Sequence, residues 1–127
     1  MSVPRRPVSL TILAYLFIVV GAGTILIDVV PLLTGDAAEK WTVLARHWQT
    51  ELAPAWAIRA FAIVGGVLML RGAGWIRWGL AAWVAFHVAI SASVPGALVM
   101  HSLLGAACVY IMFRRAASDY FRAASKV

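Results

Sequence analysis

The sequence predicts an all-α polytopic membrane protein, a four-transmembrane-helix bundle with an interfacial amphipathic helix between the first and second spans. Hydrophobic residues make up 63% of the 127 residues, and the mean hydropathy of +0.89 exceeds that of an ordinary water-soluble domain. The apolar residues fall into four runs that reach or approach the length needed to cross a bilayer. Most charged residues lie between and beyond these runs, which is typical of a chain oriented in a membrane.

We expect a single domain over residues 1–127, with spans at about 8–33, 54–70, 75–93 and 97–113. The first run follows a short basic leader. It is too long for a cleaved signal peptide and does not end in a small-residue cleavage site. Pro54 suits the first turn of the second helix, where its missing N–H costs no hydrogen bond. The Arg-Gly-Ala-Gly turn at 71–74 leads into the third span, and the Val-Pro-Gly turn at 94–96 leads into the fourth.

Two further segments are expected at the membrane surface. In residues 37–52, apolar side chains recur at spacings of three and four and predict an interfacial helix; they are Trp41, Leu44, Trp48 and Leu52. Residues 114–127 form a basic tail that also carries Tyr120 and Phe121, and we expect this tail to lie against anionic headgroups.

The distribution of lysine and arginine predicts the orientation. Eight of these residues fall on the side of the two termini, and two fall on the other side. The eight are Arg5, Arg6, Arg71, Arg77, Arg114, Arg115, Arg122 and Lys126; the two are Lys40 and Arg46. By the positive-inside rule both termini are cytoplasmic, and four spans satisfy that parity.

Composition and motifs also exclude several classes of protein. The net charge of +6 is explained by the residues that orient the spans, so we expect the lipid bilayer and no nucleic acid as partner. The single cysteine, Cys108, rules out an intrachain disulfide and a cysteine-based metal site. We find no serine–histidine–acid constellation, CxxC pair or P-loop, and therefore expect no enzyme, no cofactor and no metal site.

The second half of the chain carries a pattern of tryptophan, arginine and histidine. It consists of GAGWIRW, then WVAFHV, a second histidine and a closing FRRAASDYF, all between Arg59 and Phe121. This pattern resembles a family of small four-span bacterial membrane proteins without an established activity, and the likeness does not extend before Trp56. The resemblance implies the four-span fold and a multi-pass location in the bacterial inner membrane, and it transfers no function.

Four ionisable residues are predicted to lie within the bilayer. They are Asp28, Arg59, His87 and His101, and by their distance from the ends of their helices all four fall in the outer half of the bundle. Because such groups are costly in hydrocarbon, they form the candidate site. We expect Asp28 and Arg59 to neutralise each other.

Helical spacing places further residues beside the two histidines. Trp83 and Ser91 share a face with His87 in the third span. Gly105 and Cys108 share a face with His101 in the fourth span, where the glycine leaves room opposite a large side chain.

Three interpretations of this polar cluster are open. The preferred one is a structural or accessory protein whose partners are copies of itself or another membrane protein. It would present small residues such as Gly21, Gly65 and Gly79 to those partners. The alternative is a module that binds or transports a small solute or a proton at the histidines. The third is a haem iron or divalent metal held by His87 and His101. A cavity connected to water at Arg59 and His87 favours binding, whereas a dry and fully paired cluster favours the accessory role.

Overall fold

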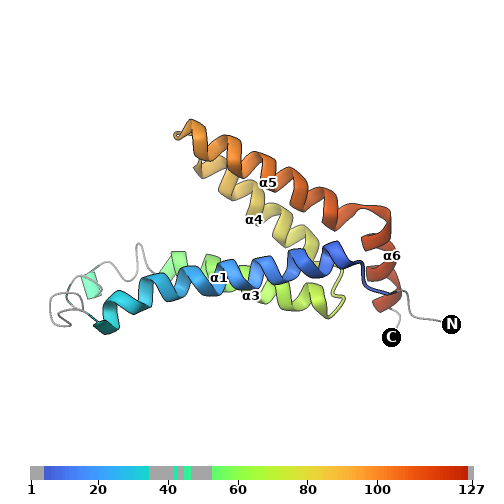
Figure 1. Ribbon diagram of the computed structural model, residues 1–127, viewed down its shortest axis with the longest axis horizontal. Helices are drawn as coiled ribbons and strands as arrows, with labels where there is room; N and C mark the ends of the chain where they lie inside the picture. Colours follow the sequence, from blue (N-terminus) through green and yellow to red (C-terminus); the bar gives the residue numbers. More distant parts are fainter. Residues whose placement is uncertain (1–4, 35–41, 43–44, 47–52, 126–127) are drawn as a thin grey trace.

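The chain folds into two helical hairpins and a short C-terminal helix (Figure 1). The structure is a computed structural model that describes residues 5–34, 42, 45–46 and 53–125. Its helices are α1 Val8–Thr34, α3 Ala53–Leu70, α4 Ile76–Ile90, α5 Pro95–Phe113 and α6 Arg115–Ala124. The all-α prediction is confirmed for this part of the chain. Most of residues 37–52, including the apolar stripe of the predicted interfacial helix, lies outside the described residues.

Three of these helices are long and apolar enough to cross a membrane, namely Val8–Val30 within α1, Ala53–Leu70 and Pro95–Phe113. The fourth apolar helix, α4, has 15 residues and ends at Ile90, three residues before the predicted end of its span. Its end is set by the turn that follows. Val94 adopts an extended conformation (φ −122°, ψ 99°), as expected for a residue before proline, and Pro95 then begins α5.

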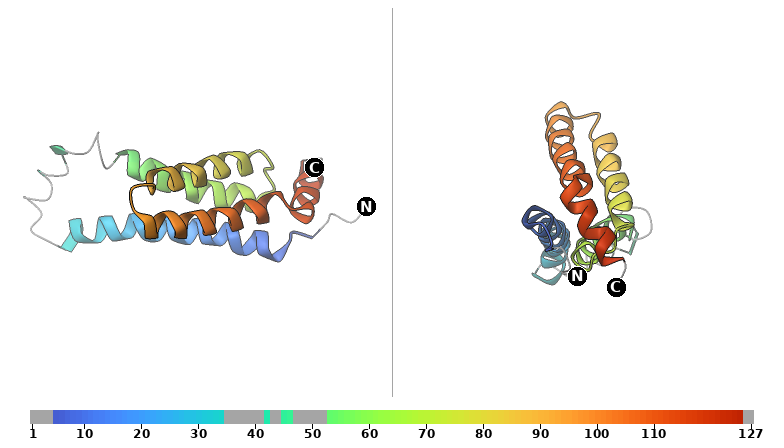
Figure 2. Two further views of the ribbon diagram at one scale, coloured as in Figure 1. Left: turned by 90° about the horizontal axis from the view of Figure 1, so that it is seen from above. Right: turned by 90° about the vertical axis from the view of Figure 1, so that its right-hand side faces the viewer.

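The two hairpins lie close together at one end and diverge toward the other. Antiparallel α1 and α3 form one hairpin, and antiparallel α4 and α5 form the second, which leans away from α1 with distance from the termini (Figures 1 and 2). We call the end at which the hairpins lie close together the joined end, and the opposite end the wide end. The joined end holds the chain termini, the α3–α4 turn and α6. A hydrogen bond of 2.5 Å from Arg114 Nη2 to Ser9 Oγ links α1 to the segment after α5 at this end.

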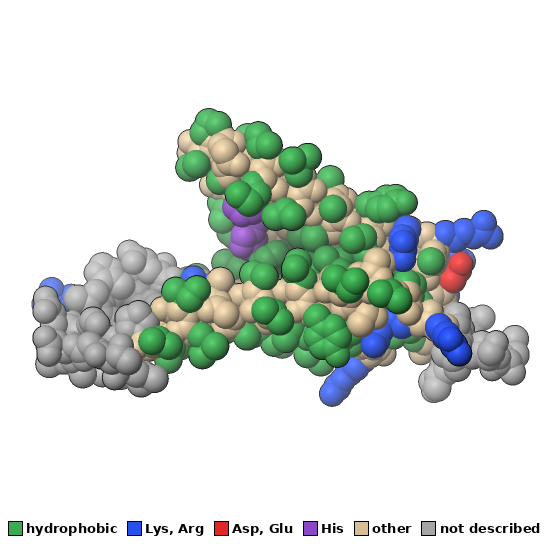
Figure 3. Space-filling view, viewed as in Figure 1, with side chains coloured by type: hydrophobic (Ala, Val, Ile, Leu, Met, Phe, Trp, Pro, Cys, Tyr) green, Lys and Arg blue, Asp and Glu red, His purple; other side chains and the backbone are tan. Residues whose placement is uncertain are grey.

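The buried core lies toward the joined end. It takes residues from the first half of α1, from α3 and α4, from the end of α5 and from α6. The fully buried large side chains are Leu10, Met69, Ile76, Leu80 and Met112. The face of the hairpins seen in Figure 3 is mostly apolar, and most of the lysine and arginine side chains visible there gather at the joined end. This arrangement agrees with a membrane protein whose basic end faces the aqueous phase.

Glycines allow the helices to approach closely within the chain. A Cβ atom at Gly66 of α3 would lie 2.6 Å from the carbonyl oxygen of Ala14, so α1 and α3 pack backbone against backbone there. The three glycines that we expected to face partners also pack internally. A Cβ atom would meet Ile63 at Gly21, Leu80 at Gly65 and Phe61 at Gly79. These glycines therefore serve contacts between the chain's own helices, and their presentation to other proteins stays a prediction.

The basic tail forms a helix that packs on the protein. Phe121 of α6 is buried, and the Tyr120 hydroxyl donates a hydrogen bond of 3.1 Å to the carbonyl oxygen of Leu70. Gly72, with φ +80°, adopts a conformation that favours glycine, and a Cβ atom there would lie 2.5 Å from that of Ala124. The two aromatic residues of the tail thus contact the end of α3 and its turn, instead of the headgroups that we predicted for them.

Candidate functional site

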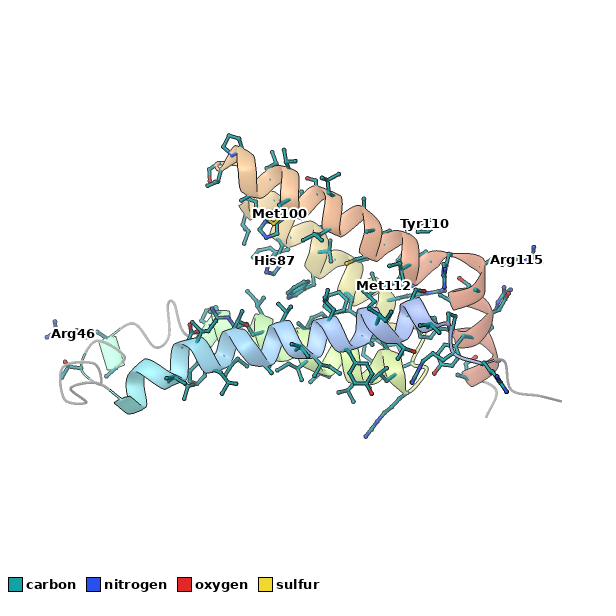
Figure 4. The ribbon with its side chains drawn as sticks, viewed as in Figure 1. Arg46, His87, Met100, Tyr110, Met112 and Arg115 are labelled. Carbon is teal, nitrogen blue, oxygen red and sulfur yellow. The ribbon has the colours of Figure 1, made fainter. Side chains whose placement is uncertain are left out.

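A cleft of about 510 Å³ opens between the two hairpins. Its walls come from α1, α3, α4 and α5 and are mostly apolar. Three of the four predicted site residues, Arg59, His87 and His101, line this cleft. Figure 3 shows histidine side chains in the hollow between the hairpins, and Figure 4 shows His87 directed into the same space. The volume lies within the range of small-molecule sites in proteins.

The fourth predicted residue, Asp28, lies beside the cleft and pairs with Arg59. The Arg59 guanidinium and the Asp28 carboxylate form an ion pair between α3 and α1, and each side chain is about a quarter exposed (28% and 27%). The indole Nε1 of Trp56 donates a second hydrogen bond of 3.2 Å to the same carboxylate. Both charges are therefore neutralised within the protein, as the sequence predicts. Trp56 had not been assigned to the site, although its position three residues before Arg59 places it on the same helix face.

His87 is held by its own helix and by an aromatic neighbour. Its ring lies against Trp83, with 4.0 Å between ring centroids, and its Nδ1 lies 3.0 Å from the Trp83 carbonyl oxygen. Because a carbonyl oxygen only accepts hydrogen bonds, Nδ1 must carry the hydrogen. In the neutral ring Nε2 then keeps a lone pair, and it is the nitrogen turned away from the backbone.

Ser91 fixes the second histidine. Its Oγ lies 2.7 Å from the carbonyl oxygen of His87 and 2.6 Å from Nδ1 of His101. The single hydroxyl hydrogen must point to the carbonyl oxygen, which cannot donate. Both contacts are then hydrogen bonds only if His101 Nδ1–H donates to Ser91 Oγ. His101 thus has the same tautomer as His87, with Nε2 as an acceptor.

The two imidazoles share one cleft wall and lie near each other. Their ring centroids are 6.4 Å apart at an interplanar angle of 66°. Within one helical turn of them, a Cβ atom at Gly105 would lie 2.7 Å from Val84, so α4 and α5 are in close contact. The backbones of α4 and α5 therefore approach closely one turn away from the two rings. Among the described residues no group of three or more histidine, cysteine, aspartate or glutamate side chains is placed to hold a metal ion.

Trp83 connects the two hairpins at the cleft. Its Nε1 donates a hydrogen bond of 3.1 Å to the Ile58 carbonyl oxygen of α3, and its ring meets Phe17 of α1 edge to face with 5.6 Å between centroids. Phe86 packs its ring edge to face against His87 at 5.7 Å. Phe17, Trp83 and Phe86 thus make part of the lining aromatic. Spacing along the sequence placed Trp83 beside His87, but nothing in the sequence linked Phe17 to them.

The polar side chains at the cleft differ in how fully they are paired, and this difference determines what the cleft can bind. The Asp28–Arg59 pair is matched in charge, whereas neither histidine Nε2 has a hydrogen-bond partner within the described part of the chain. The cleft therefore combines an apolar body with a pair of free hydrogen-bond acceptors, which is the usual composition of a small-molecule site. Comparison of the chain with protein-family models, with curated proteins and with solved structures finds no match.

Proposed function

We propose that this chain is a membrane-embedded binding protein that holds a small, largely apolar molecule in the cleft between its two hairpins. The observation that carries the proposal is the lining of the cleft, which places Arg59, His87 and His101 around about 510 Å³ of space. A structural cluster would be dry and fully paired, and here Asp28 and Arg59 are matched in charge while both imidazoles keep a free acceptor. The proposal assigns binding and no catalysis.

Two observations favour binding over the accessory role. The glycines that an accessory protein would present to partners pack against the chain's own helices. A polar group left without a partner in an apolar setting costs free energy, and a bound molecule that supplies the partner recovers this cost. Two such groups on one wall of an open cleft are more simply explained by a ligand than by packing.

We also propose where the chain resides and how it is oriented in the membrane. We place the chain in a bacterial inner membrane, with α1, α3, α4 and α5 as four spans and both termini in the cytoplasm. At 1.5 Å per residue α4 is only about 22 Å long, so the turn at 91–94 and Trp75, just before its first residue, complete its crossing. The exposed Trp75 and Trp78 suit the membrane–water interface at this end. Reporter fusions after Arg71 and at Val127 should then report cytoplasm, and a fusion near Glu39 should report periplasm. A periplasmic C-terminus would exclude the four-span arrangement.

The binding proposal is tested by filling the cleft. Leu104 lines the cleft, whereas its neighbour Leu103 is 69% exposed and does not line it. We expect Leu104→Trp to displace the bound molecule and Leu103→Trp, the matched control, to retain it. Native mass spectrometry of the protein, released gently from its own membranes, measures the mass that stays bound to each variant.

The expected result is a discrete additional mass on the wild type and on Leu103→Trp, reduced at least severalfold on Leu104→Trp. Equal retention by both variants would contradict binding in the cleft. A wild type that carries only the phospholipids found on any membrane protein, in the same amounts on all three chains, would contradict it as well.

A further inference from the structure

We infer that the cleft selects a neutral hydrogen-bond donor, and specifically a membrane-soluble aromatic alcohol such as a phenol or hydroquinone. This inference rests on the proposed function and adds the chemical class of the ligand. It depends on three properties of the cleft: the tautomers of its histidines, the balance of its charges and the aromatic character of its walls.

The tautomers make both histidines acceptors. His87 Nδ1–H is engaged by the Trp83 carbonyl oxygen, and His101 Nδ1–H is engaged by Ser91. A neutral imidazole has one donor and one acceptor nitrogen, so each ring has only the Nε2 lone pair left for a ligand. A ligand complementary to this wall carries an O–H or N–H group, and a ligand that presents only acceptors leaves both nitrogens unpaired.

The charge balance disfavours an ion. The positive charge of Arg59 is taken up by Asp28, so the cleft has no net charge when the histidines are neutral. A carboxylate or phosphate would enter without a free countercharge, in an apolar setting where an unpaired ion is costly. An ammonium group would face the same cost. A neutral hydrogen-bond donor carries no charge and therefore avoids the cost of burying either ion.

The walls favour a flat ring. Phe17, Trp83 and Phe86 line the cleft together with the His87 imidazole, which lies against Trp83. Aromatic rings gain from offset and edge contacts with other rings, beyond the apolar area that they bury. A ring hydroxyl would therefore place its donor beside the two Nε2 atoms while the ring body contacts the aromatic side chains.

The rim of the cleft indicates where such a molecule comes from. Lining residues at its edges are half exposed and apolar: Leu16 (50%), Val20 (51%), Ile90 (58%) and Leu104 (55%). In a bilayer this rim would contact lipid chains. A ligand dissolved in the hydrocarbon can thus enter sideways without crossing a polar barrier.

The test compares three probes that share one aromatic body. The probe 2-naphthol has a hydroxyl donor, 2-methoxynaphthalene replaces it with a methyl ether that cannot donate, and 2-naphthoate carries an anion. Binding to the full-length protein is measured by equilibrium dialysis against the same detergent micelles without protein. We expect 2-naphthol to bind about fivefold or more tightly than the ether, which is the contribution of one ordinary hydrogen bond, and the naphthoate to bind more weakly than 2-naphthol.

Variants identify the acceptors. His87→Phe and His101→Phe keep an aromatic ring and remove the acceptor, so each should reduce the preference for 2-naphthol over the ether and leave affinity for the ether nearly unchanged. His101→Gln restores an acceptor oxygen and should recover part of the preference. Because the comparison of probes on the wild type needs no variant, a poorly folded variant does not remove the test.

The outcomes separate the two proposals. If the ether or the naphthoate binds as tightly as 2-naphthol, and Leu104→Trp weakens all of them while Leu103→Trp does not, the cleft binds ligands but the inferred donor class is wrong. If Leu104→Trp changes the affinity of no probe, the proposed function fails together with the inference.

Discussion

Asp28 accepts contacts from Arg59 and Trp56, whereas His87 and His101 each keep one nitrogen without a partner among the described residues. These differences at single residues separate structural polar groups from candidate binding groups. The ion pair joins α1 to α3 and removes the cost of two charges in apolar helices. The histidines add no such link between the hairpins, so their loss should affect binding more than stability.

The ion pair makes a prediction about stability. Asp28→Asn or Arg59→Gln alone leaves the other charge unpaired, and on membrane-insertion scales a lone charge costs about 2.5–3.5 kcal/mol. We expect each single variant to lower the free energy of unfolding by on the order of 2 kcal/mol, and the double variant to lose less than the two singles together.

A double-mutant cycle on unfolding in detergent measures this coupling. His87→Phe is the control, because it removes only a neutral hydrogen bond and should cost on the order of 1 kcal/mol. Additive losses in the cycle would mean that Asp28 and Arg59 contribute independently, and the pairing described above would be wrong.

Secondary structure elements are positioned by close contacts that only small residues permit. Gly66 brings α3 against the backbone of α1 at Ala14, and Gly105 brings α5 against Val84 of α4. Each contact lies within one hairpin. The two hairpins are linked to each other mainly at the joined end and through Trp83, which leaves their other ends separate.

Two glycines on this pair of helices provide a matched comparison. Gly66→Ala would place a Cβ atom 2.6 Å from a backbone oxygen. Beyond its own stretch of helix, no described residue comes within 4 Å of a Cβ atom at Gly23. We expect Gly66→Ala to destabilise the fold by about 1–3 kcal/mol through overpacking. Gly23→Ala should be neutral or stabilise α1 by up to about 1 kcal/mol through helix propensity. Thermal unfolding in detergent measures both, and equal effects would show that α1 and α3 do not approach at Gly66.

Across the whole molecule, the sequence predicted the helices and much of the site, but not the shape. Apolar runs bounded by basic residues, Pro54 and Pro95 define the helices, and helix depth and face bring His87 near His101 and Asp28 near Arg59. The divergence of the hairpins depends on contacts between residues far apart in the chain, such as Phe17 with Trp83 and Ser9 with Arg114. No local spacing encodes these contacts. A closed four-helix bundle would satisfy the same apolar pattern.

The most direct test is therefore the distance between α1 and α5 at their two ends, measured by pulsed electron paramagnetic resonance. Spin labels are attached to paired cysteines in a Cys108→Ala background. One pair, Ile12→Cys with Tyr110→Cys, lies toward the joined end, and the other, Leu26→Cys with Gly96→Cys, lies toward the wide end. All four positions are exposed, and the labels on each helix are fourteen residues apart.

A closed bundle with α1 and α5 side by side would give nearly equal distances for the two pairs. We predict a clearly longer distance for Leu26 with Gly96, because the hairpins diverge toward that end. If the two label pairs give equal distances, both in detergent and in lipid bilayers, the hairpins do not diverge. That result would contradict the presence of the cleft and of the binding site within it.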